Sequence, residues 1–178
     1  MAGVSEQRRT LVLLRHAKSA YPDGVADHDR PLAPRGEREA GLAGDWLRNG
    51  APVDPPVQAV LCSSATRTRQ TLQRTGLEVP VHITDRIYGA MPGAVIEQIN
   101  AVEQIFDFDV RTLLVIGHEP TMSALALGLA GAPGTNATAA EHISTKYPTS
   151  AMAVLRIDGP WSSVELGSAA LTAFHIPR

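Results

Sequence analysis

Short runs of aliphatic residues recur along the chain, and the longer stretches between them carry apolar residues at every third or fourth position. An unbroken apolar run is typical of a strand that is covered on both faces of a sheet, because neither side of the strand then faces water. Four such runs predict strands at residues 11–14, 57–61, 113–116 and 152–155, and one more strand is expected within residues 164–174.

Helical periodicity fills the stretches between these runs. Prolines stand at the expected starts of three helices, where a missing N–H costs no helical hydrogen bond, and a glycine follows the expected end of another. The predicted helices cover residues 34–47, 65–74, 92–106 and 120–129. Residues 131–140 are expected to form a flexible loop because of their composition.

The alternation of strands and helices predicts an α/β fold. We expect a single-domain three-layer sandwich, in which a largely parallel central sheet is flanked by helices. A length of 178 residues and a hydrophobic content of 44% agree with one soluble domain that spans residues 1–178. Residues 1–8 are expected to be a flexible N-terminus.

Charge and composition exclude several classes of protein. The net charge is −2 and no block of five or six basic residues appears, which argues against an extended surface for nucleic acid or an acidic membrane. No apolar run is long enough to span a membrane or to form a secretory signal. The single cysteine, Cys62, excludes an internal disulfide framework. We expect a cytoplasmic protein that binds neither nucleic acid nor membrane, and we expect a monomer.

Polar side chains gather directly after three of the predicted strands. The segment "RHAKS" follows the first strand, "SSATRTRQT" follows the second, and "GHEPT" follows the strand at 113–116. Ligands of open α/β sheets bind beyond the carboxyl ends of the strands, so these segments predict one shared site. The side chains that they offer to it are Arg15, His16, Ser19, Ser63, Arg67, Arg69 and His118.

This group combines two imidazoles with up to three guanidiniums and contains no carboxylate. Arginine forks match the oxygens of a phosphoryl group, and a neutral imidazole can attack phosphorus. The residues therefore predict a phosphate site that forms a phosphohistidine intermediate and needs neither a metal nor another cofactor. Solvated side chains at strand ends are the alternative interpretation.

Competing motifs fail on their spacing. A cysteine-based phosphatase loop requires an arginine six positions after the cysteine, but that position is Thr68, so Cys62 is interpreted as a small buried residue. The segment "HEPTM" lacks the second histidine of a helical zinc motif. The acidic stretch "DGVADHDR" at residues 23–30 fits no calcium loop and is interpreted as a solvated loop.

Five segments carry a resemblance to a known family. The segments "LLRHAKS", "DRPLAPRG", "CSSATRTRQT", "DRIYGA" and "VIGHEPT" occur together and in the order found in the histidine phosphatase superfamily. Within it, the chain resembles the short SixA-type phosphohistidine phosphatases over most of its length. Many members of the superfamily read R-H-G where this chain has Ala17, and alanine is common in the short branch.

The resemblance implies roles for individual residues. His16 matches the nucleophile, Arg15 and Arg67 match the phosphate-binding arginines, and His118 matches the second imidazole that hydrogen-bonds the phosphoryl oxygens. Ser19 matches a serine found beside that pocket, and we count it among the phosphate-binding residues.

Asp85 stands where mutases and many phosphomonoesterases of the superfamily place an acidic glutamate. The resemblance makes it a candidate general acid with a shorter reach, and a turn aspartate is the alternative. If acid catalysis is weak, a phosphoramidate is the better substrate, because an imidazole leaving group has a pKa of about 6.5 and needs little help from a proton donor.

Together, the residues and the resemblance predict a metal-independent phosphatase that acts through a phosphohistidine on His16. Its second ring N–H is expected to be held by a backbone carbonyl, which fixes the tautomer. The expected partner is a protein that carries phosphohistidine. A phosphomonoesterase acting on a small phosphate ester, and a noncatalytic module that binds phosphate or phosphohistidine, are the alternatives.

Overall fold

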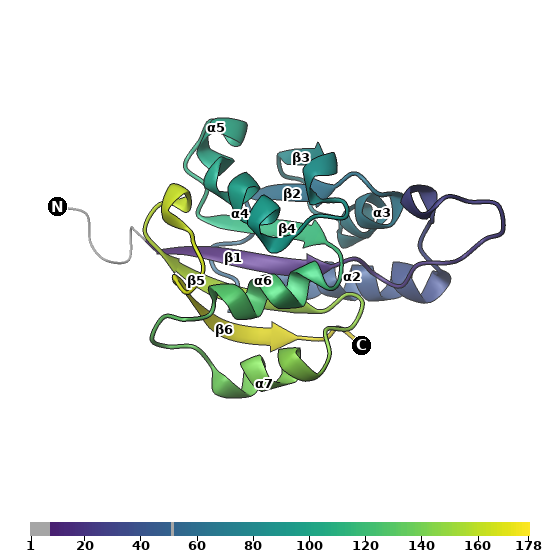
Figure 1. Ribbon diagram of the computed structural model, residues 1–178. Helices are drawn as coiled ribbons and strands as arrows, with labels where there is room; N and C mark the ends of the chain where they lie inside the picture. Colours follow the sequence, from purple (N-terminus) through teal and green to yellow (C-terminus); the bar gives the residue numbers. More distant parts are fainter. Residues whose placement is uncertain (1–7, 51) are drawn as a thin grey trace.

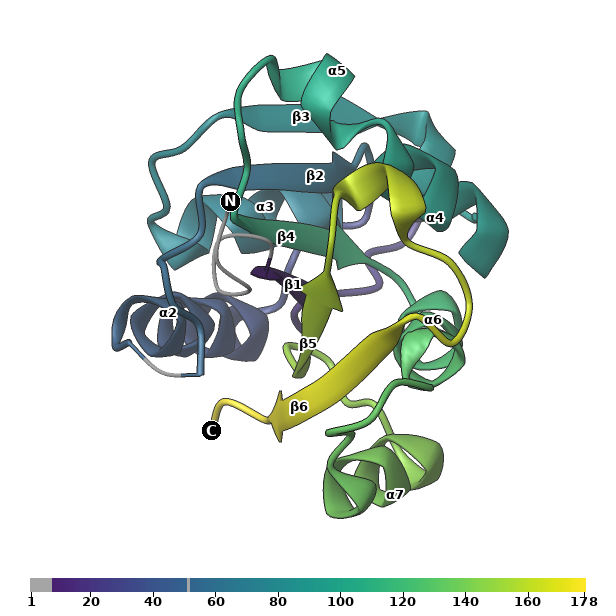
Figure 2. The same ribbon diagram turned by 90° about the vertical axis from the view of Figure 1, so that its left-hand side faces the viewer.

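A computed structural model describes residues 8–50 and 52–178 (Figure 1). Its six strands form one sheet in the order β3-β2-β4-β1-β5-β6 (Figure 2). Strands β1 to β4 are parallel to one another, β5 is antiparallel to β1, and β6 is antiparallel to β5. The strands are β1 (Arg8–Arg15), β2 (Ala59–Ser63), β3 (Val81–Thr84), β4 (Thr112–Gly117), β5 (Met152–Asp158) and β6 (Ala169–His175).

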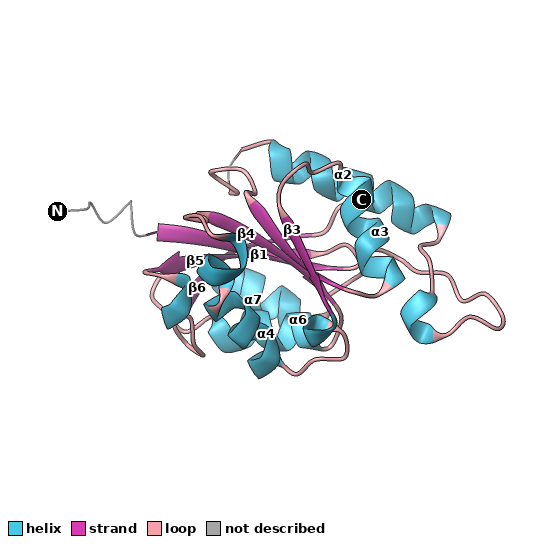
Figure 3. Cartoon of the chain, turned by 90° about the horizontal axis from the view of Figure 1, so that it is seen from above, coloured by secondary structure: helices cyan, strands magenta, loops and turns pink. Residues whose placement is uncertain are grey.

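Helices lie on both faces of this sheet. The α-helices are α2 (Pro34–Arg48), α3 (Thr66–Thr75), α4 (Pro92–Asn100), α5 (Val102–Phe106), α6 (Thr121–Leu129) and α7 (Ala137–Thr145). Three short 3₁₀ helices complete the elements: η1 (Asp27–Asp29), η2 (Asp85–Ile87) and η3 (Trp161–Ser163). Helices α2 and α3 cover one face, and α4, α6 and α7 cover the other (Figure 3). The predicted single α/β domain with a mostly parallel central sheet is confirmed.

Strand β1 lies inside this sandwich and is buried on both sides. Leu11 and Leu13 pack into the core under α4 and α6, whereas Val12 and Leu14 pack into the core under α2. This alternation explains why the sequence shows an unbroken apolar run here instead of an apolar and polar alternation.

Several boundaries differ from the sequence prediction. The helix predicted over residues 92–106 is divided at Ala101 into α4 and α5. The last residue of α4, Asn100, donates its side-chain amide to the carbonyls of Trp161 and Val164, at the two ends of η3. Strand β3 was not predicted, because it is a four-residue edge strand in which Val81 and Ile83 are exposed. Helix α7 begins inside the predicted loop at 131–140, where the Asn136 side chain caps its first turn.

Of the predicted flexible N-terminus, Arg8 is the first residue of β1, and residues 1–7 lie outside the described residues. Within the described part of the chain, no helix is both long enough and apolar enough to cross a membrane.

Helices α2 and α3 approach each other closely at Gly44. A Cβ atom at Gly44 would lie only 2.1 Å from the carbonyl oxygen of Thr75. Because this oxygen belongs to the backbone of α3, it cannot rotate away as a flexible side chain could. At Gly41, three residues earlier on α2, the nearest such atom is 3.9 Å away. The close contact packs α3 against α2, and α3 carries Arg67 in its first turn.

These two glycines provide a matched test of the packing. We expect Gly44→Ala to lower the free energy of unfolding by about 1 to 3 kcal/mol, because the added methyl group overpacks the helix contact. Gly41→Ala has space for its methyl group and should raise the free energy of unfolding by up to about 1 kcal/mol through helix propensity. Urea denaturation of both variants checks this. Equal effects of the two substitutions would contradict the close contact.

Candidate active site

The carboxyl ends of β1, β2 and β4 meet because these strands are neighbours in the order β2-β4-β1. Arg15 pairs with Gly117 at the end of β1 and β4, and the backbone N–H of His16 donates to the Gly117 carbonyl at 3.0 Å. The ring centroids of His16 and His118 are 5.3 Å apart. The structure thus brings together the three polar segments that the sequence assigned to one site.

His16 is a buried, neutral imidazole with a defined tautomer. Its Nδ1 atom lies 2.8 Å from the carbonyl oxygen of Ala17, and a carbonyl only accepts, so Nδ1 carries the hydrogen and Nε2 carries the lone pair. The side chain is 7% exposed, and burial lowers its pKa to about 3, assisted by the nearby His118 and Arg67. The predicted backbone carbonyl on the second ring nitrogen is confirmed.

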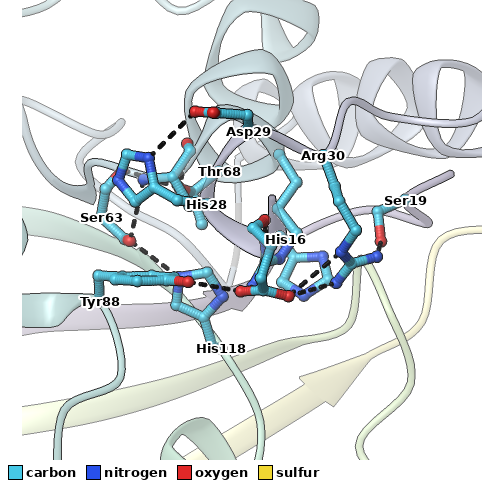
Figure 4. A network of polar contacts seen from close by, with 12 residues as sticks. His16, Ser19, His28, Asp29, Arg30, Ser63, Thr68, Tyr88 and His118 are labelled. Atoms are coloured by element: carbon cyan, nitrogen blue, oxygen red, sulfur yellow. Dashed lines mark hydrogen bonds and ion pairs between the residues drawn. The ribbon is translucent and has the colours of Figure 1, made fainter. Parts of the chain in front are cut away.

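His118 faces His16 from the end of β4. Its Nε2 atom lies 2.8 Å from the hydroxyl of Ser63, the last residue of β2 (Figure 4). Burial lowers the pKa of His118 to about 4, and the positive charge of Arg67 acts in the same direction. Both imidazoles are therefore neutral at physiological pH.

Arg15 and Arg67 complete this group. Arg15 donates from Nη1 to the carbonyl of Tyr147 at 2.8 Å, and burial lowers its pKa. The Nε atoms of Arg15 and Arg67 and the Nδ1 atom of His118 are buried and have no hydrogen-bond partner among the described residues. Three buried polar nitrogens without partners, beside a neutral imidazole, form a suitable environment for an anion.

A carboxylate also belongs to this site, which corrects the prediction. Asp27 in η1 accepts from Arg67 Nη2 at 3.1 Å, from Arg30 Nε at 3.2 Å and from the Tyr88 hydroxyl at 2.5 Å. These bonds, led by that of Tyr88, lower the pKa of Asp27 to about 2. Residues 23–27 are exposed, in agreement with a solvated loop, but this interpretation did not include the contacts of Asp27 and Arg30 with the site.

Ser19 lies close to these residues but is engaged by a neighbour. Its side chain is buried, and its hydroxyl accepts from Arg30 Nη1 at 2.8 Å.

Asp85 lies at the end of β3, in η2, where it is exposed and accepts from the hydroxyl of Ser64. Ser64 also contacts His28 Nε2 at 2.9 Å. Arg69, the third arginine in the predicted group, is exposed on α3.

Tyr88 was not identified from the sequence as a site residue. Its ring lies edge-on to His118, with centroids 5.6 Å apart, and edge-on to His28 at 4.8 Å. The available signal was its position inside the segment "DRIYGA", which contributed to the family resemblance. Asp27 and Arg30 had a similar signal, because "DRPLAPRG" begins two residues after Asp27.

Cys62 belongs to the hydrophobic core and not to the group of arginines and histidines. Cys62 is fully buried in β2, and burial raises its pKa to about 12, which confirms its interpretation as a small buried residue. The described residues contain no group of three or more His, Cys, Asp or Glu side chains arranged to hold a metal ion.

Comparison with known proteins assigns the family. The model of the histidine phosphatase superfamily, branch 1, matches residues 11–101. The chain belongs to this superfamily. The family and the similar solved structures support a hydrolase of the histidine phosphatase superfamily. The match includes His16 and Arg67 and ends before His118.

Individual relatives cover nearly the whole chain. An uncharacterized protein of Mycobacterium tuberculosis is 62% identical over 165 residues, covering 93% of this chain and 100% of the relative. A structure named as phosphohistidine phosphatase SixA from Nakamurella multipartitia is 36% identical, with a TM-score of 0.82 and 96% of each chain covered. A protein histidine phosphatase SixA complexed with tungstate is 25% identical, with a TM-score of 0.72, covering 94% of this chain and 97% of that chain.

The lowered pKa of His16 makes the protein sensitive to acid. Its folded value of about 3 lies below the value of about 6.5 for an unfolded histidine, so the unfolded state binds more protons between these pH values. The contribution of His16 to the free energy of unfolding is therefore fully present above pH ~6.5 and is lost progressively as the pH falls towards ~3.

Between pH 7 and pH 4.5, we expect the free energy of unfolding to fall by on the order of 2 kcal/mol more in the wild type than in His16→Gln. Urea denaturation at both pH values measures this difference. An identical pH dependence of the two proteins would contradict the burial of a neutral His16.

Proposed function

We propose that this chain removes the phosphoryl group from phosphohistidine on a protein, through a phosphohistidine intermediate on His16 and without a metal. One observation carries the proposal: His16, whose Nε2 has the lone pair, lies 5.3 Å from the His118 ring and close enough to Arg15 and Arg67 for their charges to assist burial in lowering its pKa. Each of these three neighbours has a buried nitrogen without a partner among the described residues. A phosphoryl group would supply the missing acceptors and present phosphorus to the imidazole.

In the first step, His16 Nε2 attacks phosphorus, and the bond from phosphorus to the nitrogen of the substrate phosphohistidine breaks. The substrate ring, protonated by solvent on its other nitrogen, takes the bonding electrons and departs as neutral imidazole. The hydrogen bond from Nδ1 to the Ala17 carbonyl stabilises the positive charge that develops on the ring. Arg15, Arg67 and His118 hold the phosphoryl oxygens as the phosphorus becomes planar. Their charges and hydrogen-bond donors are already in position before the substrate binds.

In the second step, water attacks the phosphohistidine. The new P–O bond replaces the P–Nε2 bond, phosphate is released, and the proton of the water passes to the solvent or to the departing phosphate. His16 returns to its neutral form, which its low pKa favours. Positive charge for both steps comes from guanidiniums, so a divalent cation has no required role.

The preference for a phosphoramidate rests on the state of the two carboxylates near the pocket. Asp27 has a pKa of about 2 and is therefore ionised, and Asp85 accepts a hydrogen bond from Ser64. Neither geometry presents a proton to a leaving group. An imidazole leaves without such help, whereas an alkoxide requires it. The similarity to SixA proteins supports the same substrate class.

A phosphomonoesterase acting on a small ester is the second candidate, and Asp85 is the residue that favours it. Asp85 lies at the carboxyl end of β3, which pairs with β2 beside the pocket. A rotation of its side chain away from Ser64 would free the carboxyl group to act as an acid.

The intermediate can be trapped directly. When wild type is quenched without acid during turnover of a labelled substrate, we expect acid-labile, base-stable phosphate on His16, identified by mass spectrometry. His16→Ala should reduce turnover by on the order of 10³ or more, because it removes the nucleophile. Activity should persist in EDTA. Label on another residue, or a loss of activity in EDTA that a divalent cation restores, would refute the mechanism.

Asp85 separates the two candidate substrates. We expect wild type to hydrolyse protein phosphohistidine faster than an alkyl phosphate, and Asp85→Asn to retain within about 3-fold of the phosphohistidine activity, because imidazole departs unaided. An aryl phosphate, whose leaving group is also good, serves as the control substrate. Faster hydrolysis of the alkyl phosphate by wild type, with selective loss of that activity in Asp85→Asn, would identify a phosphomonoesterase.

A further inference from the structure

We propose that Asp27 is the positioning residue that presents Arg67 to the phosphoryl group, an inference that rests on the proposed function of this pocket. Arg67 donates from Nη1 to the Asp27 carbonyl at 2.7 Å and from Nη2 to the Asp27 carboxylate at 3.1 Å. Asp27 therefore binds the edge of the guanidinium that carries its two terminal nitrogens. The Nε atom is left buried and without a partner among the described residues.

Arg67 needs such a partner because its surroundings are unfavourable for a cation. The side chain is buried, and it lies in the first turn of α3, where the positive end of the helix dipole opposes a positive charge. That turn contains no acidic residue. Without a carboxylate nearby, a long flexible guanidinium would gain free energy by turning towards water.

Asp27 is itself fixed by two further side chains. The Tyr88 hydroxyl, from the end of η2, and Arg30, from the loop that precedes α2, both donate to its carboxylate. Arg30 is held in turn by Ser19 and by the ring of Tyr21, whose centroid lies 4.1 Å from the guanidinium carbon. The carboxylate remains 57% exposed, yet each of its oxygens is engaged, so its position is defined by bonds instead of by burial.

The opposite role, a carboxylate that blocks the phosphate site, does not agree with the contacts. If Asp27 occupied the position of the phosphoryl group, it would satisfy the donors that line the pocket. Instead the Nε atoms of Arg15 and Arg67 and the Nδ1 atom of His118 have no partner among the described residues while Asp27 is in place. Asp27 thus lies beside the anion site and supports it.

The test compares two aspartates of the same 3₁₀ helix. Asp27→Asn removes the charge but keeps the size of the side chain. Asp29→Asn is the matched control, because the Asp29 side chain is 69% exposed and contacts His28. We expect Asp27→Asn to lower kcat/KM for an aryl phosphate and to weaken inhibition by inorganic phosphate, each by about 10-fold or more, whereas Asp29→Asn stays within about 2-fold.

A double-mutant cycle with Arg67→Ala distinguishes positioning from a general effect on the loop. If Asp27 acts through Arg67, Asp27→Asn should change kcat/KM by less than about 2-fold once Arg67 is absent. Equal losses in both backgrounds, an equal loss in Asp29→Asn, or tighter phosphate binding by Asp27→Asn would each overturn the proposal. If Asp27→Asn does not fold, Tyr88→Phe takes its place. We expect it to lower kcat/KM by at least about 3-fold when Arg67 is present and to have little effect in Arg67→Ala.

Direct calorimetric binding of inorganic phosphate separates this proposal from the proposed function. A wild type that binds phosphate but turns over no substrate would refute the phosphatase, while the binding constants of Asp27→Asn and Asp29→Asn would still decide the role of Asp27. A wild type that neither binds phosphate nor turns over substrate would refute both proposals.

Discussion

The parallel pairing of β1 with β4 is the constraint on which the site depends. Its register places Arg15 opposite Gly117, so that His16 and His118 emerge side by side from adjacent strand ends. A slip of one residue would move every side chain of β1 to the opposite face and would separate the two imidazoles. The apolar run of β1, buried on both faces, stabilises this register and thereby fixes His16, the proposed nucleophile, on rigid backbone.

The same pocket concentrates groups that are unfavourable when buried. Two imidazoles lose their charge, as their lowered pKa values show, and three polar nitrogens remain without partners among the described residues. Each such group reduces stability, and the cores on both sides of the sheet must offset the loss. Bound phosphate would accept hydrogen bonds from these nitrogens, so the missing hydrogen bonds that lower the stability of the free protein would increase its affinity for the anion.

The parts of this site that follow a strand directly were predictable, because an apolar run marks the strand and the polar residues after it mark the sheet edge. His16, Arg67 and His118 were found in this way. Asp27 was not, since it reaches Arg67 across forty residues of sequence through a loop whose path depends on Tyr88 and Arg30. Strand β3 and helix α7 were missed for a related reason: an exposed edge strand and a capped helix in a Gly- and Ala-rich segment have weak local patterns.

The network around Asp27 also bears on the choice of leaving group. A carboxylate that accepts from Arg67, Arg30 and Tyr88 is stabilised as an anion, which makes it a good support for a guanidinium and a poor proton donor. The interactions that would orient Arg67 therefore remove the Asp27 carboxyl group from acid catalysis. Under the proposed function, such a site would activate the phosphoryl group by charge and would give the leaving group little help from a proton donor. That balance would favour substrates whose leaving group, such as imidazole, is already stable when it departs.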